Sequence, residues 1–145
     1  MENILILGGT GAMGKFLVKR LSASYHVCVT SRKVHKSTDN VTYYQGDAHN
    51  DNFLKSILKN EKWLAIIDFM HYGTEEFKKR YQLLLANTAQ YVFLSSSRVY
   101  AASETPLTEE SPRLVDKVGS PDKPGGLSIQ LCKSEKKEFY IRYSS

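Results

Sequence analysis

Glycines near the start of the chain recur with the spacing of a phosphate-binding loop. Gly8, Gly11 and Gly14 stand at every third position, directly after the apolar run Asn3–Leu7. In this variant of the dinucleotide-binding pattern, glycines permit a tight turn, close approach of the backbone to phosphate, and close packing of a helix on a sheet. The spacing therefore predicts one kind of chemistry, the binding of a pyrophosphate anion.

The residues between these glycines would supply the contacts. If a helix begins here, the N–H groups of its first turn lack partners within the helix, and the positive end of its dipole attracts an anion. We expect the pyrophosphate over the backbone of Gly11, Ala12 and Met13, with the Thr10 hydroxyl as a further donor. A tight surface turn is the alternative, since a glycine pattern by itself is only a hypothesis.

The elements on either side must position this loop. Asn3–Leu7 has the pattern of a strand, and Lys15–Leu21 has that of an amphipathic helix. A second strand, predicted at His26–Thr30, is followed by Arg32 and Lys33. NAD-binding domains commonly place an acidic residue here for the ribose hydroxyls, whereas an arginine accommodates the 2′-phosphate of NADP. The two basic residues favour NADP over NAD, and a solvated basic turn is the alternative.

A third strand is predicted at Val41–Gln45, and an acidic residue follows it. The Asp47 carboxylate is placed to accept a hydrogen bond from the adenine amino group of a nucleotide, with Ala48 packed on the ring. The other role open to Asp47 is to cap the next helix, predicted at Asn50–Lys59.

A nearly continuous apolar run, Trp63–Met70, predicts a fourth strand that is buried on both faces. Phe69 and Met70, at its end, should line the cofactor groove near the ribose. His71 follows, and we expect it at the polar edge of the pocket rather than acting as a base.

Strands and helices alternate along the chain. A helix is predicted at Thr74–Asn87, with Thr74 as its N-cap, and a fifth strand at Tyr91–Ser95. Strands separated by helices give right-handed crossovers and a parallel sheet with helices on both faces. The expected fold class is therefore α/β, a Rossmann-type doubly wound parallel sheet that binds ligands at the carboxyl ends of its strands.

A second motif follows the fifth predicted strand. The run Ser95-Ser96-Ser97-Arg98-Val99-Tyr100 matches the Ser-Ser-x-x-Val-Tyr signature of the extended short-chain dehydrogenase/reductase family. With the glycine loop and Gly46-Asp47, residues 1 to about 116 resemble its NAD(P)-dependent epimerase/dehydratase members, which act on nucleotide sugars. The resemblance implies that Ser96 hydrogen-bonds a substrate hydroxyl or carbonyl and that Ser95 lies beside the cofactor.

The catalytic pair of that family is incomplete here. Its members carry Tyr-x-x-x-Lys on one helix face, where the tyrosine exchanges a proton while hydride moves to or from the nicotinamide. Lys133 is the candidate lysine, but Ile129 stands four residues before it, and no tyrosine in the chain has a lysine four residues later. We expect residues 1–116 to form an NAD(P)-binding domain that is inactive alone, and residues 117–145 to form an atypical tail in place of the family's C-terminal substrate domain.

Several explanations of the incomplete pair stay open. Codons for residues 127–135 exist that spell Tyr-x-x-x-Lys when shifted by one base, which predicts a frameshift in the coding DNA between about Asp116 and Leu127. Alternatively, the chain is naturally truncated or diverged, as a non-catalytic module that senses NADP or binds a partner. A further alternative is a small NADPH reductase that uses another residue, Tyr100 or His71, as its acid.

Composition bounds the remaining partners. A chain of 145 residues, 41% hydrophobic and 24% charged, suggests one soluble globular domain. The net charge of +5 comes without a basic stripe interleaved with aromatic residues, so we expect no nucleic-acid partner. No apolar run suits a membrane span or signal peptide, which favours a cytoplasmic location and no membrane partner. We expect a buried Cys28, no metal site, and an open sheet edge that would permit a homodimer.

Overall fold

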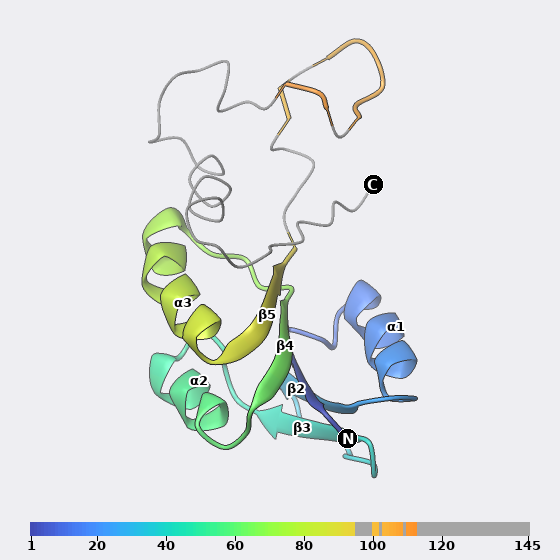
Figure 1. Ribbon diagram of the computed structural model, residues 1–145, viewed down its shortest axis with the longest axis vertical. Coiled ribbons are helices and arrows are strands. Elements are labelled where there is room, and N and C mark those ends of the chain that lie inside the picture. The colour runs from blue at the N-terminus through green and yellow to red at the C-terminus, as the bar shows by residue number, and fades with distance from the viewer. Residues whose placement is uncertain (95–99, 102, 109, 113–145) are drawn as a thin grey trace.

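Parallel strands form the sheet of the computed structural model, which describes residues 1–94, 100–101, 103–108 and 110–112 (Figure 1). The five strands are β1 (Asn3–Leu7), β2 (His26–Ser31), β3 (Val41–Gln45), β4 (Trp63–Asp68) and β5 (Thr88–Phe93). Their order is β3-β2-β1-β4-β5, and each neighbouring pair runs parallel. The strand order reverses at β1, which is where doubly wound sheets bind their ligands. This is the Rossmann-type arrangement predicted from the sequence.

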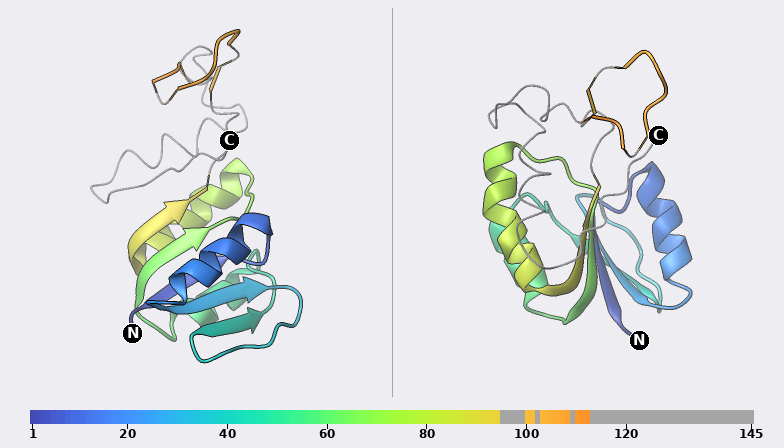
Figure 2. Two further views of the ribbon diagram at one scale, coloured as in Figure 1. Left: turned by 90° about the vertical axis from the view of Figure 1, so that its right-hand side faces the viewer. Right: turned by 45° about the horizontal axis from the view of Figure 1, so that its top comes forward.

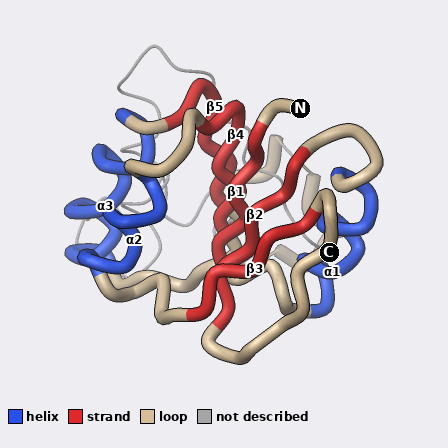
Figure 3. The backbone as a smooth tube through the Cα atoms, turned by 90° about the horizontal axis from the view of Figure 1, so that it is seen from below, coloured by secondary structure: helices blue, strands red, loops and turns tan. Residues whose placement is uncertain are grey.

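Helices cover both faces of the sheet. They are α1 (Ala12–Leu21), α2 (Asp51–Leu58) and α3 (Thr74–Ala86). Helix α1 lies on one face, and α2 and α3 lie side by side on the other (Figures 1 and 2). Figure 3, a view from below, shows the strands as a twisted layer between the two helix layers. The loops that leave the carboxyl ends of the strands therefore gather at one edge.

Apolar side chains fill both interfaces between helices and sheet. Ile4 and Ile6 of β1 belong to a core cluster with Val18 of α1. Leu5 and Leu7 belong to the cluster beneath α2 and α3. Because successive side chains of a strand point to opposite faces, a strand covered on both sides must be apolar throughout. This requirement explains the unbroken apolar run that precedes the glycine loop.

Three predicted strands have different boundaries in the structure, and the smallest difference is at β2, which ends at Ser31 rather than Thr30. β5 begins at Thr88, earlier than predicted, because Thr88 pairs with Trp63 and its hydroxyl donates to the Trp63 carbonyl oxygen at 3.2 Å. It ends at Phe93. β4 ends at Asp68, whose carboxylate accepts a hydrogen bond from Met70 N at 2.9 Å and bends the chain out of the strand.

The helix caps differ from prediction at one point. The N-cap of α3 is Gly73 rather than Thr74, because the Gly73 carbonyl oxygen already accepts the first helical bond, from Phe77 N at 2.9 Å.

Cys28 is fully buried in β2 as predicted, and burial raises the pKa of its thiol to about 11. None of the helices in the described ranges has the length and apolar character needed to cross a membrane.

Candidate functional site

The glycine motif after β1 requires glycine at its first and last positions, Gly8 in the turn and Gly14 in α1. Gly8 has φ of +70°, in the left-handed region where a side chain is strained. At Gly14, a Cβ would lie 2.4 Å from the Gly9 carbonyl oxygen. Helix α1 can therefore pack against the turn only because Gly14 lacks a side chain.

The N-terminus of α1 is open to a ligand. Its N-cap is Gly11, and no side chain of the described residues caps the N–H groups of the first turn. Ala12 and Met13 in that turn are exposed, and a Cβ on Gly11 would find its nearest neighbour 3.9 Å away. The free N–H groups and the helix dipole suit an anion that approaches the backbone closely.

A pocket of about 300 Å³ opens beside this turn, at the carboxyl edge of the sheet. Residues that follow β1, β2, β3 and β4 each contribute to its wall. The lining residues are Gly8, Thr10, Thr30, Arg32, Gly46, Asp47, Ala48, His49, Phe69, Met70 and His71. The predicted residues Gly11, Ala12, Met13, Gly14 and Lys33 are not among the residues that line it.

A buried threonine ties β2 to the glycine turn. Thr30 is 2% exposed, and its Oγ1 accepts a hydrogen bond from Gly8 N at 3.1 Å. This bond satisfies a backbone donor of the turn and fixes the turn against the neighbouring strand. Sequence reasoning missed Thr30, and the available signal was a hydroxyl at the end of an apolar strand.

The two basic residues after β2 lie differently. Arg32 is exposed and lines the pocket. Lys33 is also exposed, but its N–H donates to Ser31 Oγ at 3.1 Å, and the residue does not contribute to the lining. Of the two, Arg32 is therefore the one positioned to meet a group inside the pocket.

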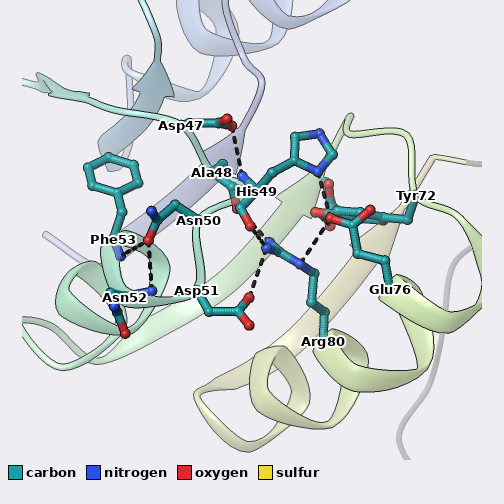
Figure 4. Close-up of polar contacts among 11 residues, drawn as sticks. Asp47, Ala48, His49, Asn50, Asp51, Asn52, Phe53, Tyr72, Glu76 and Arg80 are labelled. Atoms are coloured by element: carbon teal, nitrogen blue, oxygen red, sulfur yellow. Dashed lines mark hydrogen bonds and ion pairs between the residues drawn. The ribbon is translucent and has the colours of Figure 1, made fainter.

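The loop after β3 holds Asp47 in a defined orientation. Asp47 Oδ1 accepts a hydrogen bond from His49 N at 2.9 Å. Asn50 caps α2 by accepting from the N–H groups of the first turn, so the helix-cap role considered for Asp47 is wrong (Figure 4). Asp47 Oδ2 makes no hydrogen bond to the described residues. Ala48 is buried beside it, and Asp47 and His49 are the polar residues that this loop contributes to the lining.

Residues that follow β4 complete the wall. Phe69 and Met70 line it as hydrophobic surface, and His71 stands exposed at its edge. Met70 N is held by Asp68, whose Oδ2 also accepts from Tyr72 Oη at 2.9 Å and from Tyr91 Oη at 2.8 Å. Full burial raises the pKa of Asp68 to about 6, against the lowering effect of these donors.

The predicted catalytic residues Ser96 and Lys133, and Ser95 beside the cofactor, lie outside the described residues. Within the described part, no group of three His, Cys, Asp or Glu side chains is arranged to hold a metal ion. The structure also brings His49 to the pocket, which sequence reasoning did not anticipate.

Residues 4–121 match the family model described as the NAD dependent epimerase/dehydratase family. The chain belongs to this family. The resemblance inferred from the glycine loop, Gly46-Asp47 and the serine-rich motif is thereby confirmed. Curated proteins gave no match to the sequence.

Solved structures of similar fold include sugar-nucleotide enzymes. The dTDP-glucose 4,6-dehydratase of Bacillus anthracis, in complex with NAD, has a TM-score of 0.70 at 17% identity, over 99% of this chain and 54% of that one. The UDP-Glc/GlcNAc 4-epimerase of Campylobacter jejuni has a TM-score of 0.64 at 21% identity, over 78% and 43%. The enzyme WbmH of Bordetella bronchiseptica, in complex with NAD⁺, has a TM-score of 0.68 at 12% identity, over 99% and 56%. The chain spans about half the length of these structures, and at such identities the likeness shows the fold alone.

Proposed function

We propose that this chain binds NADP at the carboxyl edge of its sheet, as the cofactor half of a nucleotide-sugar epimerase, dehydratase or reductase. The observation that carries the proposal is the convergence of Gly8, Arg32 and Asp47 on one pocket from three separate loops. Membership of an NAD-dependent family, and NAD in solved structures of this fold, support the same class of cofactor.

The lining residues support one orientation of the cofactor. The pyrophosphate lies over the open N-terminus of α1 at Gly11–Met13, within reach of the Thr10 hydroxyl. The adenine ring packs on Ala48 with its amino group toward Asp47. Phe69 and Met70 line the ribose, and the nicotinamide end extends toward the segment that carries Ser95 and Ser96.

Preference for NADP over NAD rests on the residues that leave β2. The residues that line the pocket from this loop are Thr30 and Arg32, and neither is acidic. A guanidinium presents a planar fork of donors that suits the oxygens of a 2′-phosphate. Lys33 adds positive charge next to this position without entering the pocket.

The bound nicotinamide would supply hydride exchange with a substrate carbon. The chain's own groups bind and orient the nucleotide, and Ser96 would polarise the substrate oxygen. Ile129 occupies the place of the family's proton-exchanging tyrosine, four residues before Lys133. We therefore propose that the chain alone binds cofactor without turnover, and that a nucleotide sugar is the substrate of an intact relative.

Calorimetric titration of the wild-type chain with NADPH and with NADH tests the proposal. We expect both nucleotides to bind, NADPH more tightly, and NADPH oxidation with nucleotide sugars to stay at background. Absence of binding by either nucleotide overturns the proposal. Oxidation that is lost in Tyr100→Phe would instead support the small reductase.

A further inference from the structure

Arg80 of α3 is a buried cation behind the wall that carries Asp47. Its side chain is only 4% exposed, although it neither lines the pocket nor belongs to the apolar core. A buried guanidinium is costly unless its N–H groups are paired. The partners of Arg80 therefore show which parts of the fold this side chain holds.

The guanidinium of Arg80 is paired on each of its nitrogens (Figure 4). Nη1 donates to the Ala48 carbonyl oxygen, and Nη2 donates to the His49 carbonyl oxygen. Nη2 also bonds Asp51 Oδ1 at 2.9 Å, and Nε lies 3.3 Å from Glu76 Oε1. One side chain on α3 therefore donates hydrogen bonds to two consecutive carbonyl oxygens of the loop after β3.

One peptide unit connects the hydrogen bonds of Arg80 to the side chain of Asp47. A trans peptide is planar, so its C=O and its N–H point in opposite directions. In the Ala48–His49 peptide, the C=O accepts from Arg80, and the N–H donates to Asp47 Oδ1 at 2.9 Å. Fixing the carbonyl end of this plane also fixes the direction of its N–H, and through it the Asp47 carboxylate.

A second contact closes α3 on the same loop. His49 Nδ1 lies 2.6 Å from Glu76 Oε1, the carboxylate oxygen that also meets Arg80 Nε. The centre of the Tyr72 ring lies 5.5 Å from Arg80 Cζ and adds a cation–π contact. Contacts from helix α3 and from the residues before it thus hold the peptide plane from one side.

We propose that Arg80 is a positioning residue for adenine recognition, whose fork locks the Ala48–His49 peptide and so holds the Asp47 carboxylate toward the adenine amino group. The inference rests on the proposed nucleotide site. A lysine would keep the charge but not the planar fork, so it cannot engage both carbonyls in one orientation.

The test compares two nucleotides that differ at one group of the base. In reduced nicotinamide hypoxanthine dinucleotide phosphate, a carbonyl replaces the adenine amino group and turns its oxygen toward Asp47. We expect the wild-type chain to bind NADPH roughly tenfold more tightly than this analogue, because a hydrogen bond to a charged acceptor is lost. The ratio that matters is the dissociation constant of the analogue divided by that of NADPH. In Arg80→Lys we expect this ratio to fall close to one.

The ratio separates positioning from general stability. If the role of Arg80 is merely structural, its substitution would weaken the binding of both nucleotides by the same factor, and the ratio of the two dissociation constants would not change. Lys79→Met removes an exposed cation from the position of α3 directly before Arg80, and this variant should keep the wild-type ratio. Thermal unfolding of each variant first establishes that it is folded.

A second variant serves if Arg80→Lys does not fold. Asp51→Asn with Glu76→Gln removes the carboxylates that orient the guanidinium, and these side chains are 61% and 37% exposed. We expect the ratio to fall partway in this variant. An unchanged ratio in a folded variant, or a wild-type chain that binds NADPH without discrimination, overturns the inference and leaves the nucleotide site standing. A wild-type chain that binds neither nucleotide overturns both.

Discussion

The Thr30 hydroxyl on β2 and the Gly8 N–H after β1 are joined by a hydrogen bond of 3.1 Å. It ties the ends of two neighbouring strands where the pocket begins. Thr30→Val keeps the shape of the side chain and leaves the Gly8 N–H without its acceptor, so we expect a loss of about 1–3 kcal/mol in the free energy of unfolding. We also expect severalfold weaker binding of NADPH, measured by calorimetry.

Thr88→Val is a matched control for this variant. Thr88 is also a buried strand threonine, but it lies at the start of β5, away from the carboxyl edge. It should lose stability in denaturant titrations and keep the wild-type affinity for NADPH. Equal losses of affinity in the two variants would show that Thr30 has no particular role at the pocket.

Two glycines of the loop should separate binding from folding. Gly11 has φ of −69° and open space around it, so Gly11→Ala should cost less than about 1 kcal/mol of stability, the difference between glycine and alanine as an N-cap. Its methyl group would stand where a phosphate approaches, and we expect roughly tenfold weaker NADPH binding, about 1.4 kcal/mol. Gly14→Ala forces a Cβ against the Gly9 backbone and should cost about 1–3 kcal/mol of stability. The reverse pattern, with Gly11→Ala unfolded and Gly14→Ala stable, is incompatible with this loop geometry.

Arg32→Asp should reverse the preference for NADPH over NADH. The substitution replaces the cation in the pocket with a carboxylate that repels a 2′-phosphate and accepts hydrogen bonds from ribose hydroxyls. Lys33→Asp makes the same change of charge outside the lining and should keep the preference. Titration of both variants with both nucleotides decides, and an unchanged preference in Arg32→Asp would remove the argument for NADP.

Asp68 should make the stability of the protein depend on pH between about 4 and 6. Burial raises its pKa from 3.8 to about 6, so the folded state keeps a proton that the unfolded state has lost. The stability contributed by this proton is complete below pH 3.8 and is lost as the pH rises through about 6. At one pKa unit per 1.36 kcal/mol, the loss is at most about 3 kcal/mol.

Asp68→Asn isolates this effect from other carboxyl groups. Asparagine does not titrate, so the stability of the variant relative to wild type should rise as the pH goes from 4 to 7. Denaturant titrations across this range measure the difference. A difference that does not change with pH would show that Asp68 is ionised in the folded protein throughout.

The fold could be predicted because its determinants are local. Each strand reads as an apolar or β-branched run, and the glycine spacing marks where β1 ends and α1 begins. The alternation of elements then sets the parallel topology. The start of β5 was misplaced because Thr88 is held by a hydrogen bond to Trp63 on another strand, which no local pattern records.

Parts of the site could not be predicted, again because they depend on contacts between residues that are far apart in the sequence. Thr30 and Arg80 act through partners 22 and up to 32 residues away in the sequence. In the run Lys78-Lys79-Arg80, nothing local separates the buried arginine from the exposed lysines beside it. Likewise, the sequence indicates a basic pair after β2, but the turn at Ser31 decides that Arg32 and not Lys33 lines the pocket.

Chemical-shift mapping of the labelled chain during titration with NADPH tests directly whether the nucleotide binds at the carboxyl edge of the sheet. At 16.5 kDa the chain suits two-dimensional amide spectra. We predict that the amide signals of Gly8, Thr10, Asp47 and Ala48 shift together with one dissociation constant, while those of Tyr25 and Glu61, before β2 and β4, stay in place. Shifts confined to that opposite edge, or no shifts at saturating NADPH, would contradict a nucleotide pocket at the carboxyl edge of the sheet.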